Sequence, residues 1–220
     1  MPPSAISLNI VQNKRGSMTG KVEKRRDALR AKLTDIAEAR IREAGISAIK
    51  ARDLAKQADC AVGAIYNVFG DLQDIIIAVN GRTFQRLGRA VAQSLAGKET
   101  LPPTERLIAM SCAYLEFAAA NPNAWRSLFD VRMTKDMEVP QWYLDELERL
   151  FGFISGPVRE CFPDMSGREA GLMTRALFSS VHGIVLLGLE NRISGVPKDQ
   201  LQDMLALILR QVTETKHISK

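Results

Sequence analysis

Apolar residues recur at steps of three and four along most of this 220-residue chain, and no segment alternates apolar and polar residues as a half-buried strand does. The clearest case is residues 23–44, which carry one apolar stripe followed directly by Gly45, a residue suited to end a helix. The stripe consists of Leu29, Leu33, Ile36, Ala37, Ile41 and Ala44. The pattern predicts an amphipathic helix here and an all-α fold overall.

Glycine, proline and capping residues divide the remaining sequence into further helices. No proline occurs from residue 4 to residue 101, so helices can run without interruption there. Two short helices are predicted at 49–58 and 62–69, and Asp71 is the expected N-cap of a long helix over 72–96. After Pro102-Pro103, the predicted helices are 104–120, 122–131, 140–161, 166–192 and 197–215. The total is about nine helices.

Residues 1–20 show no clean period and contain two prolines and two glycines. We therefore expect a flexible basic arm there, with Met18 as an alternative start. The expected organisation beyond the arm is a head over 21–71 and a body over 72–220, with helix 72–96 as the connector.

Charge is distributed unevenly between these parts. The composition, 46% hydrophobic and 25% charged, is typical of a globular protein, and the net charge is +5. Residues 1–70 carry 13 basic and 7 acidic side chains, whereas residues 71–220 carry 17 and 18. The whole excess therefore lies in the first third, which indicates an N-terminal part that faces nucleic acid or a membrane surface.

Composition also argues against several classes of protein. No apolar run approaches the roughly 18 residues of a membrane span, and the N-terminus lacks the apolar core of a secretory signal. Three widely spaced cysteines form no disulfide framework and suit a reducing cytoplasm. With only two histidines, we expect no metal site, no cofactor and no His-based triad.

The strongest feature is the pair of short helices between residues 47 and 72. Two short helices joined by a tight turn can hold the second helix in a DNA major groove. An apolar seam would hold the pair together, and its small alanines allow close approach of the helix backbones. The seam consists of Leu54, Ala55, Ala58, Ile65 and Phe69. The sequence thus predicts a helix-turn-helix unit, although a seam of this kind also occurs in ordinary helix packing.

Two short runs carry a resemblance to a known family. The Arg-Asp-Leu-Ala run at 52–55, the Ile-Tyr-x-x-Phe-Gly run at 65–70 and the long helix after them resemble the TetR family of dimeric transcriptional regulators. The resemblance implies a regulator, most simply a repressor, that releases a palindromic double-stranded DNA operator when a small-molecule effector binds its helical body. It implies a homodimer and no enzymatic activity.

The resemblance also assigns candidate DNA contacts. Lys50 and Arg52 could bind phosphate or a guanine edge, and Asn67 could contact an adenine. Tyr66 is a candidate for holding a phosphate or, alternatively, for packing between helices. The apolar start of the second helix could touch a thymine methyl group, and basic residues of the first helix could bind phosphates. The remaining candidates are Val62, Gly63, Ala64, Lys21, Arg25 and Arg26.

The body offers candidates for a ligand pocket and a dimer surface. Aromatic and soft side chains could line the pocket, and His182 is either a core histidine or a polar anchor for the ligand. These candidates are Phe117, Trp125, Phe129, Met133, Trp142, Phe153 and His182. The last two helices suit a four-helix dimer interface or, alternatively, a monomeric core. The interface candidates are Leu172, Ala176, Ile184, Leu201, Leu205, Ile208 and Val212.

Two other functions remain open from the sequence. A helical adaptor that binds protein partners would lack the steep salt dependence of DNA binding. An all-helical enzyme would need an organised constellation of acid, base, nucleophile or metal, and the chain shows no Gly-rich phosphate loop, paired-histidine spacing or Gly-x-Ser-x-Gly elbow.

Overall fold

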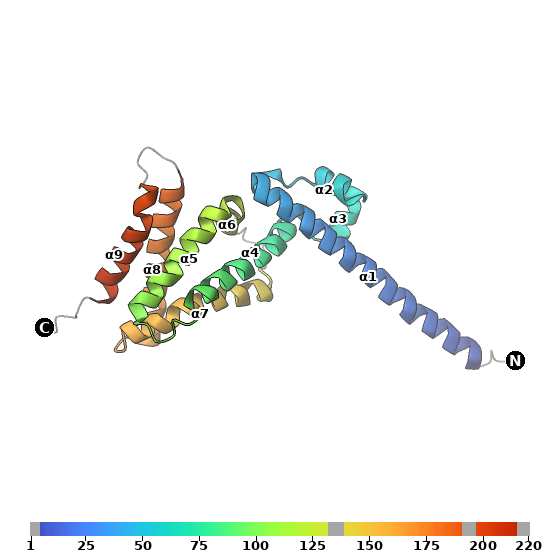
Figure 1. Ribbon diagram of the computed structural model, residues 1–220. Helices are drawn as coiled ribbons and strands as arrows, with labels where there is room; N and C mark the ends of the chain where they lie inside the picture. The colour runs from blue at the N-terminus through green and yellow to red at the C-terminus, as the bar shows by residue number, and fades with distance from the viewer. Residues whose placement is uncertain (1–4, 132–138, 191–196, 215–220) are drawn as a thin grey trace. The chain divides into compact units, whose positions relative to one another are not determined.

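The computed structural model describes residues 5–131, 139–190 and 197–214, with side chains from residue 20 onward. Within these ranges the chain forms nine α-helices, two short 3-10 helices and no strand, which confirms the predicted all-α fold (Figure 1). The chain divides into two compact units, residues 1–79 and 80–220, and the division falls within one helix, α4 (Leu72–Leu95).

The first unit is built from α1 (Ala5–Ala44), a 3-10 turn at Ile46–Ala48, α2 (Ala51–Ala58), α3 (Val62–Val68) and the first two turns of α4. Its core is a cluster of buried apolar side chains to which all four helices contribute. The members are Leu33, Ala37, Ile41, Ile49, Leu54, Ala55, Ala58, Ile65, Val68, Phe69, Ile75 and Val79. The unit therefore has a hydrophobic centre of its own.

Local backbone chemistry sets the ends of these helices. Gly45, at φ 75°, follows α1 in a conformation that favours glycine, and Asp59 adopts the left-handed region at the end of α2. Asp71 caps α4 as predicted, because its Oδ1 accepts a hydrogen bond of 2.8 Å from the backbone N–H of Asp74. Asp74 in turn accepts one from the backbone N–H of Gly70 at 2.8 Å.

The first helix is longer than the sequence indicated. The expected helix begins at residue 23, after a flexible arm, whereas α1 begins at Ala5. The physical reason is that Pro2 and Pro3 are the last prolines before residue 102, and isolated glycines at 16 and 20 weaken a helix without ending it. The side chains of residues 1–19, including Lys14 and Arg15, lie outside the described part.

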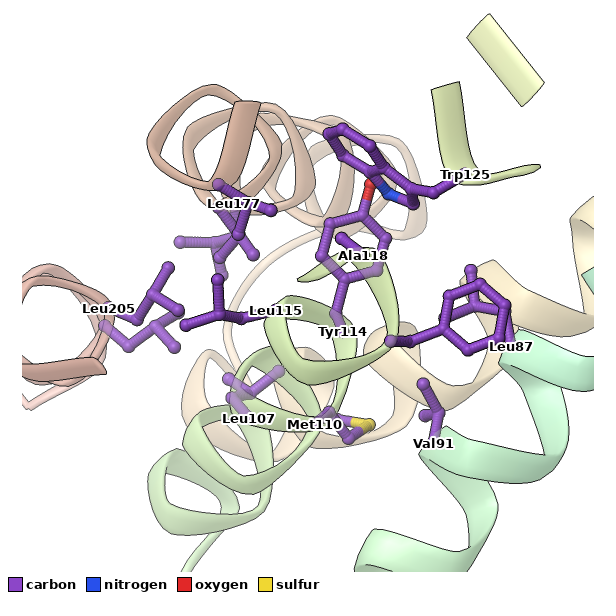
Figure 2. Packing of buried hydrophobic residues seen from close by; sticks show 14 of the residues in the cluster. Leu87, Val91, Leu107, Met110, Tyr114, Leu115, Ala118, Trp125, Leu177 and Leu205 are labelled. Carbon is purple, nitrogen blue, oxygen red and sulfur yellow. The ribbon is translucent and has the colours of Figure 1, made fainter. Parts of the chain in front are cut away.

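The second unit contains the rest of α4 and five further helices. These are α5 (Pro103–Ala120), α6 (Pro122–Asp130), α7 (Gln141–Cys161), α8 (Gly167–Leu189) and α9 (Leu201–Thr213), the last preceded by a 3-10 turn at Lys198–Gln200. Helix α5 contacts α6, α7, α8 and α9, so it is the central helix of this unit. Figure 2 shows its side chains in the core, among them Leu107, Met110 and Leu115.

Helix α8 is well capped and closely packed at its far end. Ser166 and Glu169 form a capping box at its start. Gly188 permits close approach of α9, since a Cβ built on it would lie 2.2 Å from a methyl carbon of buried Leu201. The absence of a side chain at position 188 is therefore a packing requirement.

Helix α8 bears on the expectation about membrane spans. Among the described residues, α8 is long and apolar enough to cross a membrane by length and composition, and α3 with α4 meets the same test as a bent pair. Its charged residues, Arg168, Glu169 and Arg175, interrupt the helix, so its longest uncharged run is shorter than a membrane span. Core helices of soluble proteins meet this test too, so it is weak evidence for a membrane span.

Candidate functional site

The predicted seam between the two short helices is present. Leu54, Ala55 and Ala58 of α2 are buried, as are Ile65 of α3 and Phe69 just after it. The turn between the helices contains Asp59, whose left-handed backbone reverses the chain within a few residues. This geometry fixes α3 against the core of the first unit and leaves its opposite face exposed.

The exposed face of α3 carries the candidate DNA contacts. Val62, Gly63 and Asn67 are exposed, Ala64 is half-buried, and Tyr66 is 48% exposed, so much of the tyrosine ring is outside the core. Lys50 is the N-cap residue of α2 and Arg52 lies in its first turn, and both side chains are exposed. We use the name α2–α3 face for this set of exposed or half-buried candidate contacts: Lys50, Arg52, Val62, Gly63, Ala64, Tyr66 and Asn67.

Two basic residues of α1 stabilise the motif, a role that the sequence analysis missed. Arg30 donates a hydrogen bond to the carbonyl of Val68, and its guanidinium lies 4.3 Å from the centre of the Phe69 ring. Lys32 donates to the carbonyl of Ala58 at 2.6 Å, at the end of α2. In the sequence, the only indication of these contacts is that Arg30 and Lys32 lie close to Leu33, a member of the apolar stripe.

Other basic residues of α1 are directed to solvent. Lys21, Arg25 and Arg26 are exposed on the part of α1 that precedes its buried segment. Because α3 itself carries no charged residue, positive charge in the described part of this unit comes from α1 and from α2 with its N-cap residue Lys50. This separation suits backbone contacts by α1 and base contacts by neutral groups.

In the second unit the structure brings two of the predicted pocket residues together with a third, His182. The ring centroid of His182 lies 4.2 Å from that of Phe129 and 5.3 Å from that of Trp125. Two residues that the sequence analysis did not select complete the group. Tyr114 places its Oη 2.8 Å from Nδ1 of His182, and the Phe178 ring stacks on the imidazole at 5.8 Å. We call these five residues the His182 ring cluster.

Burial determines the protonation state of this cluster. Burial lowers the pKa of His182 below its ordinary value of 6.5 and raises that of Tyr114 well above its ordinary value of 10.0. The nearby indole of Trp125 acts on the pKa of Tyr114 in the opposite direction, but less strongly. Both side chains are therefore neutral at neutral pH.

The other predicted pocket residues lie elsewhere. Trp142 is 45% exposed and contacts Tyr143, and it lies against Gly81 of α4. Phe117 is buried in the core, and Phe153 is half-buried against it. Met133 lies outside the described residues. Spacing along one helix could have suggested Phe178, which precedes His182 by one turn, but Tyr114 belongs to a different helix.

A buried polar pair joins α4 to α6 next to this cluster. The side-chain amide of Asn80 donates to the carbonyl of Ser127 at 2.7 Å, and the Ser127 hydroxyl donates to Asn80 Oδ1 at 2.7 Å. Both residues are fully buried. Because Trp125 and Phe129 are on the same short helix as Ser127, a shift of α6 would act directly on α4.

The predicted interface residues divide into exposed and buried sets. Leu172 and Ala176 are exposed on α8, whereas Ile184, Ile208 and Val212 are not fully covered. Leu201 and Leu205 are buried in the core of their own unit, so they have no surface to offer a partner. The exposed strip on α8 instead continues through residues that the sequence analysis did not select, among them Ser179, Ser180 and Leu187.

Comparison with known proteins identifies the second unit. A family model described as the tetracyclin repressor-like C-terminal domain matches residues 107–212, from α5 to α9. The chain thus carries a C-terminal domain of the TetR type. A search of curated proteins gave no match. The TetR-family fold is that of a transcriptional regulator rather than an enzyme, and none of the described residues form a group of metal-ligating side chains.

Solved structures share this TetR fold over nearly their whole length at low identity. RolR in complex with resorcinol matches with a TM-score of 0.64 and 16% identity, over 88% of this chain and 91% of that chain. FadR from Bacillus subtilis in complex with stearoyl-CoA matches at 0.59 and 21%, over 85% and 99%. The TetR-family regulator PfmR from Thermus thermophilus matches at 0.55 and 17%, over 84% and 98%.

Proposed function

We propose that this TetR-family protein is a cytoplasmic repressor that binds a palindromic operator as a homodimer and releases it when a small molecule binds its helical body. The observation that carries the proposal is the α2–α3 face, a rigidly supported helix pair with an exposed outer surface. The domain division that goes with it is a DNA-binding head over 21–71 and a ligand-binding and dimerisation body over 72–220.

Roles on the DNA follow from the chemistry of each exposed group. Arg52 and Lys50 are suited to phosphate or to the acceptor edge of guanine, and the Asn67 amide is suited to adenine. Tyr66, with about half of its surface exposed, can donate its hydroxyl hydrogen to a phosphate. Lys21, Arg25 and Arg26 would bind the sugar–phosphate backbone, and this contribution would weaken steeply with salt.

Dimerisation would use the exposed strip of α8 together with α9. Leu172, Ala176 and Leu187 lie on one face of α8, separated by small residues that allow close helix approach. Leu207 of α9 adds another exposed apolar side chain. A two-fold dimer presents two α3 helices, which matches a palindromic operator with half-sites spaced by helical turns.

Ligand response would pass through α4, because this helix runs from the first unit into the second. The Asn80–Ser127 pair fastens α4 to α6, and α6 carries two rings of the His182 ring cluster. RolR and FadR, two proteins of the same fold, are known with resorcinol and stearoyl-CoA bound. A coupling of about 1–3 kcal/mol would change operator affinity roughly 5–150-fold.

The decisive experiment is selection of bound DNA from a random pool, followed by titration of the selected duplex and a scrambled duplex at two salt concentrations. We expect a palindrome, and both affinities should fall steeply with salt. The double variant R52A/N67A should lose more affinity for the selected duplex than for the scrambled one. Binding that does not depend on salt, or selection without any enriched sequence, would contradict DNA recognition and favour a protein-binding adaptor.

A further inference from the structure

One polar atom of the His182 ring cluster lacks a hydrogen bond of good geometry. The indole N–H of Trp125 is buried, the residue is only 1% exposed, and its one polar neighbour, the Tyr114 hydroxyl, is near enough to affect the pKa of that tyrosine but is not placed to accept a well-formed hydrogen bond. Figure 2 shows the indole nitrogen and the hydroxyl oxygen of Tyr114 close together in the core. Buried donors are almost always paired, and an unpaired one raises the free energy of the folded state. This N–H is therefore available to an acceptor atom of a ligand.

The groups around this donor favour an uncharged ligand. Tyr114 and His182 are already hydrogen-bonded to each other, and burial shifts the pKa of each so that both stay neutral. The hydroxyl of Tyr114 retains the capacity to bond a second oxygen. An ionised ligand would lose its large hydration free energy here and gain only contacts with neutral dipoles. A neutral hydroxyl has a much smaller hydration free energy to lose. The cluster thus selects a neutral group that both accepts and donates.

Phe129 is the residue of the cluster whose side chain can move aside. Its ring lies over the imidazole of His182 at 4.2 Å and edge-on to Trp125 at 5.6 Å, yet the residue is 43% exposed on the last turn of α6. Rotation of this side chain toward solvent would leave a space the size of one benzene ring against His182 and Trp125. A planar ligand of one ring would restore the ring contacts that Phe129 gives up.

We propose that the His182 ring cluster binds a small neutral phenol, whose ring replaces that of Phe129 over His182. The phenol oxygen accepts a hydrogen bond from the Trp125 indole N–H and bonds the hydroxyl of Tyr114. This inference rests on the proposed function, since it names the chemical class of the ligand to which the repressor responds. The unpaired donor and the single exposed ring are the two independent observations behind it.

The test is calorimetric titration of the full chain with phenol, and with toluene as the isosteric compound that lacks the hydroxyl. We expect phenol to bind about tenfold or more tightly than toluene, because only phenol satisfies the indole donor. The variant Y114F should weaken phenol binding about tenfold. The matched control Y143F removes the hydroxyl of another largely buried tyrosine, which packs on Phe84 and Trp142 and bonds Asn80 rather than any member of the ring cluster, and it should leave phenol binding unchanged.

The variant F129A gives the sharpest outcome. If the phenol takes the place of this ring, F129A removes a competitor and strengthens phenol binding roughly threefold or more. Unchanged or weaker binding by F129A, or equal binding of phenol and toluene, overturns the proposal. Equal loss in Y114F and Y143F, with the unfolding midpoints of both variants unchanged, does so as well.

Direct binding separates this inference from the function on which it rests. A chain that binds its selected duplex with steep salt dependence but does not bind phenol keeps the proposed function and loses the ligand class. A chain that binds phenol with the expected variant pattern but does not bind DNA keeps the ligand class and loses the proposed function. Phenol binding that leaves operator affinity unchanged supports the site and contradicts the switch.

Discussion

The basic side chains in the first third of the chain fall into two groups, which differ in what the side chains contact. Arg30 and Lys32 bind backbone carbonyls at the ends of α3 and α2, while Lys21, Arg25 and Arg26 face solvent. A charge count treats all five as equivalent. All five side chains are exposed, but we expect only the former two to stabilise the fold, because they bind backbone carbonyls of neighbouring helices.

We predict that R30A and R26A differ in kind. R30A should lower the free energy of unfolding by about 1 kcal/mol, because it removes a ring contact and a hydrogen bond to α3. R26A should leave stability unchanged but reduce the slope of log affinity against log salt by about one, since it removes one phosphate contact. Chemical denaturation and DNA titrations at several salt concentrations check both variants. A reduced salt slope in R30A would contradict this division.

His182 should make stability depend on pH. Its pKa is lowered in the folded protein, so between that value and about 6.5 the unfolded chain binds more protons than the folded one. The free energy of unfolding therefore rises with pH across this window, and the contribution is lost as pH falls below about 6.5. Denaturation near pH 7 and near pH 5 should show a larger loss in the wild type than in H182Q. An equal loss in both would place His182 in a water-like environment when folded.

At the scale of elements, α8 combines a packed face and an exposed face. Gly188 lies directly against the side chain of Leu201 on α9, whereas a Cβ at Gly171 on the same helix would meet nothing within 4 Å. Glycine lowers helix stability relative to alanine unless packing requires it. Alanine substitutions at the two positions therefore distinguish the effect of helix propensity from the effect of packing within one helix.

We expect G188A to destabilise the protein by about 1–3 kcal/mol, because the new methyl group would displace buried Leu201. G171A should instead stabilise it by up to about 1 kcal/mol through helix propensity. Thermal or denaturant unfolding of the two variants against the wild type measures both effects. If G188A proves as stable as G171A, α9 shifts to accommodate the methyl group.

Helix content and most helix ends could be predicted from the sequence, because they depend on neighbouring residues. Gly45, Asp71, Pro103 and Pro122 each lie at a helix end through local backbone chemistry. The start of α1 could not, since nothing near residue 20 forces a helix to begin or end there.

The candidate sites were predicted less completely, because periodicity shows that a residue is buried without showing what covers it. Leu201 and Leu205 have the spacing of an interface and yet pack into their own core. The contact of Tyr114 with His182 joins residues 68 positions apart, so no local pattern indicates it.

At the scale of the whole molecule, the proposed dimer depends on the exposed strip of α8. We expect L187E to raise the dimer dissociation constant by at least about 100-fold, or roughly 3 kcal/mol, because it would bury a charge without a partner. Operator affinity should fall with it, while affinity for nonspecific duplex changes less. L101E changes an exposed leucine outside this strip and should leave the dimer intact. Sedimentation measurements on both variants test the assignment, which fails if L187E remains dimeric.

The composition of α3 bears on how such a regulator can acquire new targets. Its outer residues, Val62, Gly63, Tyr66 and Asn67, contribute nothing to the core that holds the helix in place. Substitutions there can alter which bases are preferred while the thermodynamic stability of the head stays nearly constant. Under the proposed function, DNA preference and foldability would thus be encoded in different residues of the same seven-residue helix. A duplicated copy of this chain could therefore diverge toward a different operator by single substitutions, with every intermediate still folded.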